Sequence, residues 1–280
     1  RKELLMIEYD CHMHSEFSTD SRTPLLKQVQ KSIATGLQGI CMTDHMDYEF
    51  PREQMDSALI YEGNPFEFDW EKYKQEIHQL QSEYPDFELM LGVECGLQTS
   101  PSVIRKNTRL IKDSDLDFVI GSLHLVDGKD PYYSHFWERE NPSSCIRHYF
   151  EQLYENLLLF PEIDSLGHLD YIVRYAPESF TYSPLEYRDI LEEILTYLIR
   201  KDIALEINSS ALKSTHQPNP HEEILSLYRE LGGQALTIGS DAHKPEFIRF
   251  QFQQIEALLK KCGFSEYQIF KKRKPISKSL

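Results

Sequence analysis

Histidine is concentrated at the ends of short apolar runs in this sequence. Six of the eleven histidines lie where a strand-like run gives way to a polar loop, and acidic residues occupy equivalent places. The segments are Asp10-Cys-His-Met-His14, Thr43-Asp-His45, Gly92-Val-Glu94, Gly121-Ser-Leu-His124, Gly167-His-Leu-Asp170 and Gly239-Ser-Asp-Ala-His243. A single histidine is usually a surface or hydrogen-bonded core residue. Repetition of the pattern along the chain predicts a site that holds several metal ions.

His12 and His14 are the most informative pair within this pattern. They are two residues apart, so in a strand both side chains project from the same face and can reach one metal ion. This spacing alone is weak evidence. The five further segments that end in the same way make the metal hypothesis strong.

Strand-like and helix-like segments alternate along the whole chain. Five of the six helical segments between strands start at or just after proline, which favours the first helical turn. The expected strands are 4–12, 37–43, 87–94, 116–122, 163–169, 203–208 and 235–240, and the expected helices are 24–35, 70–84, 101–112, 142–160, 184–201, 220–231 and 245–262.

Such alternation predicts a parallel sheet with crossover helices. Ligands that come from nearly every strand favour closure into a distorted, seven-stranded (β/α)7 TIM-like barrel, whose active site lies at the carboxyl ends of the strands. An open doubly wound sheet, the alternative, would spread the same residues along a line. We expect one domain over residues 1–270. The basic run Lys271-Lys-Arg-Lys274 is most simply part of a solvated tail, 271–280.

Charge and cysteine content narrow the function classes. The 30 Lys and Arg against 45 Asp and Glu give a net charge of -15, which opposes binding of long nucleic acid but not of a small phosphorylated substrate near metal ions. The five cysteines form no CxxC pair, which suits reduced thiols in a cytoplasmic protein, and Cys11 and Cys95 are expected to pack the structure. No segment resembles a signal peptide or a membrane span.

Two long loops rich in aromatic residues are expected beside the strand ends. Residues 47–69 and 125–141 are either the walls of a substrate site or loops packed by their own aromatic side chains, and the sequence favours neither. The aromatic residues are Tyr48, Phe50, Tyr61, Phe66 and Phe68 in the first loop, and Tyr132, Tyr133, Phe136 and Trp137 in the second.

The six segments, taken in order, resemble the motifs of the polymerase and histidinol phosphatase (PHP) superfamily, and the resemblance covers essentially the whole chain. Within that superfamily the chain looks most like the histidinol-phosphatase branch. The supporting stretches are Phe68-Asp-Trp-Glu-Lys-Tyr73, Gly167-His-Leu-Asp-Tyr-Ile-Val-Arg174 and Glu206-Ile-Asn-Ser-Ser-Ala-Leu-Lys213.

The resemblance implies three divalent metal ions, which the ligand types suit to Zn, Fe or Mn. It assigns the first ion to His12, His14, Glu94 and Asp241, the second to Glu94, His124 and His168, and the third to Asp20, His45 and His243. Asp20 departs from family members that have histidine at this place.

The implied reaction is hydrolysis of a phosphate monoester, L-histidinol phosphate, by hydroxide shared between ions that also neutralise the phosphoryl oxygens. Substrates left open are nucleotides, oligonucleotides and phosphotyrosine. A polymerase-associated proofreading module is disfavoured because the barrel fills the chain, and a decayed metal-binding protein is disfavoured because all nine ligand positions hold competent residues. Both monomer and homodimer remain open.

Other roles are predicted from position alone. Arg174 and Arg22, with Lys213, are candidates to bind phosphate oxygens. The amine and imidazole of the substrate need acceptors, for which Asp47, Glu49 and Glu206 are candidates. Asp20 or Asp241 is the candidate acid for the leaving oxygen.

Overall fold

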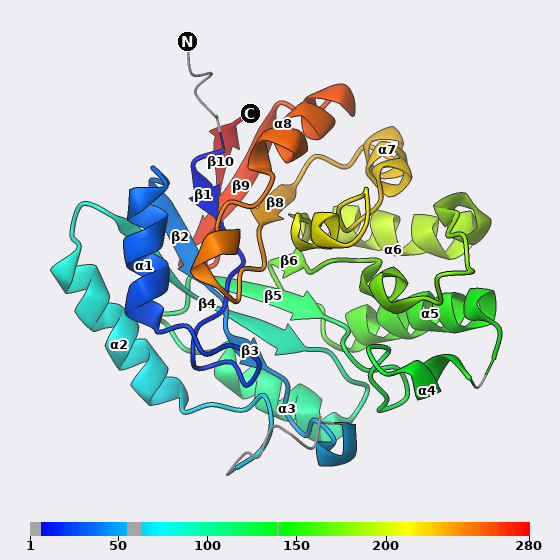
Figure 1. Ribbon diagram of the computed structural model, residues 1–280, viewed down its shortest axis with the longest axis horizontal. Helices are drawn as coiled ribbons and strands as arrows, with labels where there is room; N and C mark the ends of the chain where they lie inside the picture. Colours follow the sequence, from blue (N-terminus) through cyan, green and yellow to red (C-terminus); the bar gives the residue numbers. More distant parts are fainter. Residues whose placement is uncertain (1–6, 55–62, 139) are drawn as a thin grey trace.

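Seven parallel strands form a nearly closed barrel in the computed structural model, which describes residues 7–54, 63–138 and 140–280 (Figure 1). Neighbouring strands follow the order β1-β2-β4-β5-β6-β7-β8, and every neighbouring pair is parallel. The strands are β1 (Tyr9–Asp10), β2 (Gly39–Met42), β4 (Glu88–Gly96), β5 (Phe118–Ser122), β6 (Ser165–Leu166), β7 (Ala204–Asn208) and β8 (Leu236–Gly239). The predicted single-domain barrel is therefore confirmed.

The barrel closes between its first and last strands through a few main-chain contacts. Met13 forms a parallel bridge with Ala242, and the Cys11 N–H donates to the Ile238 carbonyl at 2.9 Å. Because this seam is short, the barrel is nearly but not fully closed by strand pairing. The seam also brings the first and last histidine segments of the chain together.

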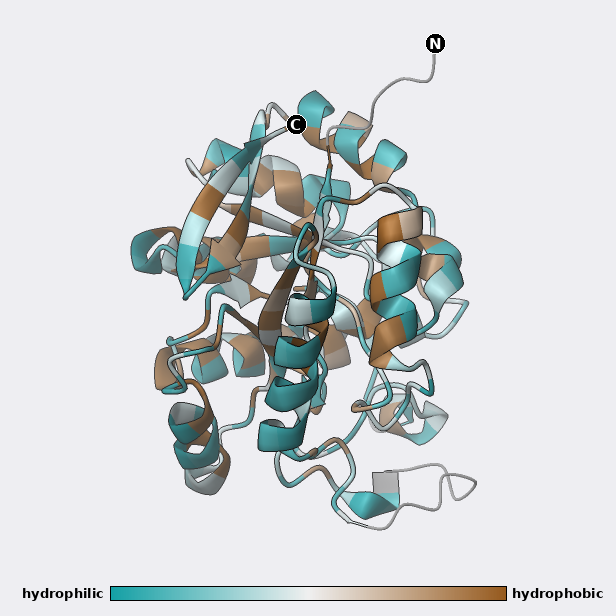
Figure 2. Ribbon diagram, turned by 90° about the vertical axis from the view of Figure 1, so that its left-hand side faces the viewer, coloured by the Kyte–Doolittle hydropathy of each residue, from teal (hydrophilic) through white to brown (hydrophobic). Residues whose placement is uncertain are grey.

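Helices cover the outside of the barrel and turn their apolar faces inward (Figure 2). Asp69 caps α2 by accepting from the Lys72 N–H, and Asn141 caps α5 in the same way, one residue before Pro142. The helices are α1 (Leu25–Ala34), α2 (Trp70–Glu83), α3 (Pro101–Leu110), α4 (Ser134–Trp137), α5 (Pro142–Leu159), α6 (Arg188–Lys201), α7 (Glu222–Glu230) and α8 (Phe252–Lys261).

The expected helices 184–201 and 245–262 start furthest from their predicted first residues. The segment expected to begin at Pro184 first forms a 3-10 turn, Pro184–Tyr187, and α6 follows it. The segment expected to begin at Pro245 contains a 3-10 turn, Pro245–Phe247. Arg249 and Gln251 then adopt positive φ angles of 60° and 54°. This left-handed backbone cannot continue a right-handed helix, so α8 begins only at Phe252.

The strands also differ in extent from the expectation. Only two residues of the predicted strand 4–12 pair as β1, and its first three residues lie outside the described part of the chain, as does Tyr61 of the first aromatic loop. A short strand that the sequence did not predict, β3 (His45–Met46), pairs with the end of β4.

The stretch 271–280, expected to be a solvated tail, belongs to a C-terminal hairpin whose last strand is largely exposed. Strands β9 (Glu266–Lys271) and β10 (Lys274–Ser279) pair antiparallel. Arg273 in the turn binds the Asp164 carboxylate and donates to the Glu162 carbonyl at 2.7 Å. Phe270 stacks on Phe118, with 5.1 Å between the ring centroids. The hairpin thus covers the amino end of the barrel, and its basic turn is matched to acidic groups there.

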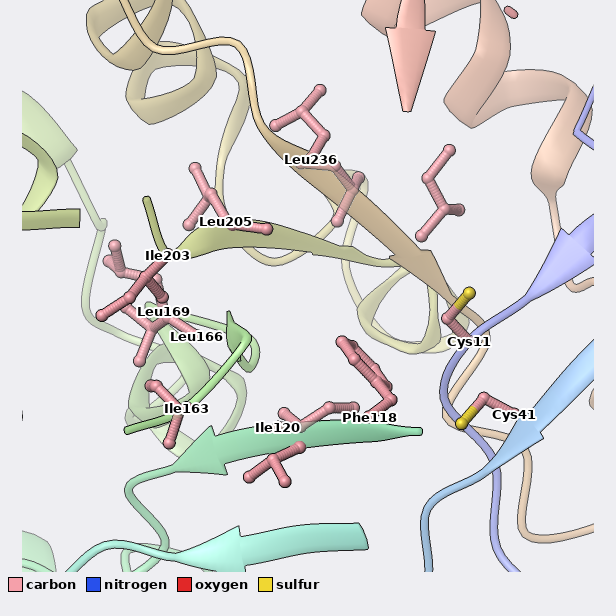
Figure 3. Packing of buried hydrophobic residues seen from close by; sticks show 14 of the residues in the cluster. Cys11, Cys41, Phe118, Ile120, Ile163, Leu166, Leu169, Ile203, Leu205 and Leu236 are labelled. Carbon is pink, nitrogen blue, oxygen red and sulfur yellow. The ribbon is translucent and has the colours of Figure 1, made fainter. Parts of the chain in front are cut away.

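Buried apolar side chains from β2, β5, β6, β7 and β8 and from the adjoining segments contribute to the hydrophobic core (Figure 3). Cys11 is 2% exposed and Cys95 is fully buried, consistent with the packing role expected for both. Among the described residues, no helix has the length and apolar character needed to cross a membrane.

Replacing Arg273 with alanine is expected to lower the free energy of unfolding by roughly 3 kcal/mol, because the buried Asp164 carboxylate would lose its cation. Urea denaturation followed by circular dichroism measures the change. Lys271→Ala is the matched control, since its ion pair with Glu88 is solvent-exposed and contributes less than about 1 kcal/mol. Equal losses in the two variants would show that the Arg273 contact does not hold the hairpin.

Candidate metal centre

Glu94, at the end of β4, is the centre of a buried cluster of histidines and carboxylates. Its Oε2 lies 3.0 Å from His12 Nε2 and 3.0 Å from His45 Nδ1. Its Oε1 lies 2.9 Å from His168 Nε2 and 3.2 Å from His124 Nε2. Glu94 is fully buried. One carboxylate therefore contacts histidines from four different parts of the barrel.

Three donors come together where β1 and β8 end. His12 Nε2 and His14 Nε2 are 3.1 Å apart, and His14 Nε2 is 3.1 Å from Asp241 Oδ1. The bridge between Met13 and Ala242 places the two segments side by side. Glu94, His124 and His168 form a second group of converging ligand atoms, on the other side of the Glu94 carboxylate.

The third predicted group, Asp20, His45 and His243, also lies together. Asp20 Oδ2 is 3.0 Å from His243 Nε2 and 3.7 Å from His45 Nε2. His14 adjoins this group, because its ring stacks on those of His45 and His243 at 4.2 Å and 4.1 Å between centroids. Asp20 is the most solvent-exposed member, with 39% of its side chain accessible. The nine side chains expected to bind metal are thus neighbours in space.

Carboxylate and hydroxyl acceptors hold the other ring nitrogen of three of these histidines. Glu206 binds His12 Nδ1, and Asp47 accepts from His124 Nδ1 at 2.8 Å. Ser18 Oγ lies 3.1 Å from His14 Nδ1. A proton held on Nδ1 leaves a lone pair on Nε2, which is the atom that faces the cluster.

Electrostatics in the cluster also favour a cation. Burial alone would raise the pKa of Glu94 and Asp241, but the imidazoles around them, His12 foremost, outweigh burial and hold both pKa values well below the usual carboxylate range. Burial and two neighbouring imidazoles lower the pKa of His14 to about 3. Carboxylate and imidazole groups are the donors that Zn, Fe and Mn prefer. The residues present therefore fit divalent metal ions.

A cavity of about 340 Å³ opens above the cluster. Arg174 projects into it and is held by Asn208 and Asn219, with its Nη1 3.5 Å from Asp241 Oδ2. Aromatic residues and one further acid complete the wall, namely Phe50, Phe66, Asp130, Tyr132, Tyr133, Tyr171 and Tyr175. Both aromatic loops thus contribute to a pocket wall.

The candidates for substrate binding divide by position. Arg174 and Asp47 line the cavity, whereas Arg22 and Lys213 are exposed outside its wall. The Lys213 ammonium lies 4.0 Å from the centroid of the Phe247 ring.

The two remaining acidic candidates also lie away from the cavity. Glu49 is paired with Lys106 at 3.1 Å on the surface, and Glu206 is buried behind His12. Sequence reasoning missed Asp130, although it belongs to the second aromatic loop, because nothing in a loop sequence shows which way a carboxylate points.

Comparison with known proteins identifies the family to which the chain belongs. The family model described as the PHP domain matches residues 10–210. The histidinol-phosphatase of Lactococcus lactis subsp. lactis is 32% identical over 270 residues, which cover 95% of each chain. The probable histidinol-phosphatase of Clostridium acetobutylicum is 30% identical over 95% of this chain and 97% of its own. The chain therefore belongs to the PHP domain family.

Its position within that family follows from sequence and structure together. A crystal structure of the Lactococcus lactis histidinol phosphate phosphatase, in complex with Zn, L-histidinol and phosphate, superimposes with a TM-score of 0.83. It is 30% identical and covers 96% of this chain and 99% of its own. A putative histidinol phosphatase from Listeria monocytogenes, 17% identical with a TM-score of 0.73, shares the fold. The chain lies in the histidinol-phosphatase branch.

Glu94→Gln is expected to weaken metal binding by more than the ~10-fold that loss of a supporting residue alone can cause, because four histidines would lose the charge between them. Metal content after dialysis, measured by mass spectrometry, tests this. Glu88→Gln changes a carboxylate on the same strand, far from the cluster, and should retain metal fully. Equal metal content in the two variants would show that Glu94 does not bind metal.

Proposed function

We propose that the protein hydrolyses L-histidinol phosphate to L-histidinol and phosphate with three divalent metal ions. The observation that carries this proposal is the convergence of six histidines and three carboxylates at the base of one cavity. The resemblance to histidinol-phosphatases over almost the full chain supports the choice of substrate. Zinc in the Lactococcus lactis structure makes Zn the first ion to test.

The nine side chains described above would hold the ions, in the three groups that the sequence predicts. When bound, divalent ions supply a nucleophile at neutral pH and neutralise charge on the phosphoryl group. Burial would raise the pKa of Asp20, but His243 and His45 hold it below its usual range, as the imidazoles do for Asp241. Both acids therefore stay ionised, which suits them to binding cations better than to protonating the leaving oxygen.

Arg174 is the residue that we assign to the phosphoryl group. Two asparagines fix its guanidinium within the cavity, beside Asp241. A guanidinium presents paired N–H donors that match two phosphate oxygens, and its charge persists at every physiological pH. Arg174 would therefore orient the phosphoryl group over the cluster and stabilise charge that develops on it. Arg22 and Lys213 lie outside the cavity wall, and their role would be to attract the phosphorylated substrate from solvent.

The aromatic wall would receive the organic part of the substrate. Tyr171 and Tyr175 contact each other edge-on, and Tyr132 packs against Tyr175 with 5.4 Å between centroids. A planar imidazole can stack in such a wall. Asp130 lines the same cavity and is the acid that we assign to the cationic amine. The pocket thus pairs an anion site at its base with a cation site in its wall.

Phosphate release from a substrate panel tests the function directly. We expect kcat/KM for L-histidinol phosphate to exceed the values for nucleoside monophosphates, short oligonucleotides and phosphotyrosine by at least ~10²-fold, equivalent to about 2.7 kcal/mol. Chelation should abolish the activity, and Zn should restore it. A flat profile or a nucleotide preference would keep the phosphatase chemistry and reject the substrate.

Asp130→Asn is expected to raise KM for L-histidinol phosphate by about tenfold with little change in kcat, because it removes binding energy for the amine only. Steady-state kinetics should show no such rise with p-nitrophenyl phosphate, which lacks the cation. Asp127→Asn, a nearby substitution of a carboxylate paired with His148 outside the cavity, is the control. An equal effect on both substrates would contradict the role of Asp130.

A further inference from the structure

The Glu206 carboxylate is buried behind the metal cluster and does not line the cavity. We propose that Glu206 is a positioning residue that holds two metal ligands, His12 and His168, in the positions from which both reach the metal site. This inference rests on the proposed metal centre, but it does not depend on the identity of the substrate.

Glu206 lies in β7 and is 1% exposed. Its Oε1 binds His12 Nδ1, while its Oε2 accepts from the main-chain N–H of His168 at 2.7 Å. Asn208, on the same strand, donates to Oε2 at 3.3 Å. Each carboxylate oxygen therefore contacts the segment of a different metal ligand, one after β1 and one after β6.

The contact with His12 sets the chemical state of that imidazole. An ionised carboxylate only accepts hydrogen bonds, so the Nδ1 atom must carry a proton when it faces Glu206. The lone pair then lies on Nε2, which is directed at Glu94 and His14. The negative charge behind the ring also makes Nε2 a stronger donor to a metal ion.

The contact with His168 positions the main chain rather than the ring. Within the described part of the chain, His168 Nδ1 has no hydrogen-bond partner, so no side chain fixes the ring from behind as Glu206 does for His12. The hydrogen bond to the His168 N–H is therefore the polar restraint that Glu206 adds to this segment. It places His168 so that Nε2 reaches Glu94.

Close packing keeps Glu206 in this position. A Cβ atom added at Gly239 would lie 2.2 Å from His12 Cβ and 2.9 Å from Glu206 Oε1. Glycine at this point of β8 thus lets the backbone pack directly on the pair. A carboxylate enclosed on that side has little freedom to follow a displaced histidine.

Glu206 also separates support of the ligands from contact with substrate. Asp47 holds His124 in the same manner, but Asp47 lines the cavity, so its substitution would change two functions together. Substitution of Glu206 changes the support alone. At saturating zinc, Glu206→Gln should lower kcat and leave KM for L-histidinol phosphate unchanged.

Metal retention is the decisive measurement. Glutamine keeps the shape of the side chain, but its NH2 group cannot accept, so one of the two hydrogen bonds is lost. In zinc-loaded protein titrated with a chelator, Glu206→Gln should release metal at about 10- to 100-fold lower chelator concentration than the unsubstituted protein. Glu206→Asp keeps the charge on a shorter side chain that cannot reach both partners, and it should lose metal similarly. It replaces the glutamine variant if that variant does not fold.

Asp164→Asn is the matched control. Asp164 is a buried carboxylate that accepts from the Val119 N–H at 2.8 Å and binds Arg273, near the amino end of the barrel. Its substitution should lower the melting temperature and leave metal retention unchanged. Unchanged retention in Glu206→Gln, or equal loss in Asp164→Asn, would overturn the positioning role. Failure of the unsubstituted protein to bind Zn, Fe or Mn would instead overturn the metal centre, and the role of Glu206 with it.

Discussion

The attraction between Glu94 and the histidines around it is the constraint on which the active end of the barrel depends. Burying an ionised carboxylate is costly unless opposite charge or hydrogen-bond donors surround it. Glu94 is fully buried, and its neighbours come from four separate segments. Those segments must therefore meet at one point. A parallel barrel satisfies this requirement because it brings the carboxyl ends of all its strands together.

Close approach of these segments requires small residues at particular places. A Cβ atom at Gly239 would overlap His12, and one at Gly96 would lie 1.9 Å from the Asp47 carboxylate. Glycine at these positions lets a strand backbone pass directly beside a functional side chain. This explains the glycine of the Gly-Ser-Asp-Ala-His motif, because Gly239 leaves space for the His12 side chain.

Local patterns predicted the elements well, and long-range contacts account for what they missed. The alternation of strands and helices, and the gathering of histidines at one end of the barrel, depend on periodicity and on the ends of strands, which are visible in sequence. Asp20 and the division of the ligands among three ions were implied only by the resemblance to the PHP superfamily. The hairpin around Arg273 was missed because the acids that stabilise its basic turn, such as Asp164, are remote in sequence. The sequence also suggested Glu206 for substrate binding. Its actual partner, His12, is remote in sequence, and side-chain alternation along β7 does not reveal that contact.

The arrangement of the site has a consequence for how substrate preference and metal chemistry can vary. Glu206 holds ligands from inside the barrel, where its neighbours are strands, whereas Asp130 and Tyr132 come from a loop at the rim. Strand residues are fixed by packing on both sides, while loops tolerate substitution. A change of leaving group therefore requires changes only in the loop wall, and the hydrolytic centre beneath it can stay intact. This separation would let the same metal cluster serve a different phosphate ester once the loop wall is altered.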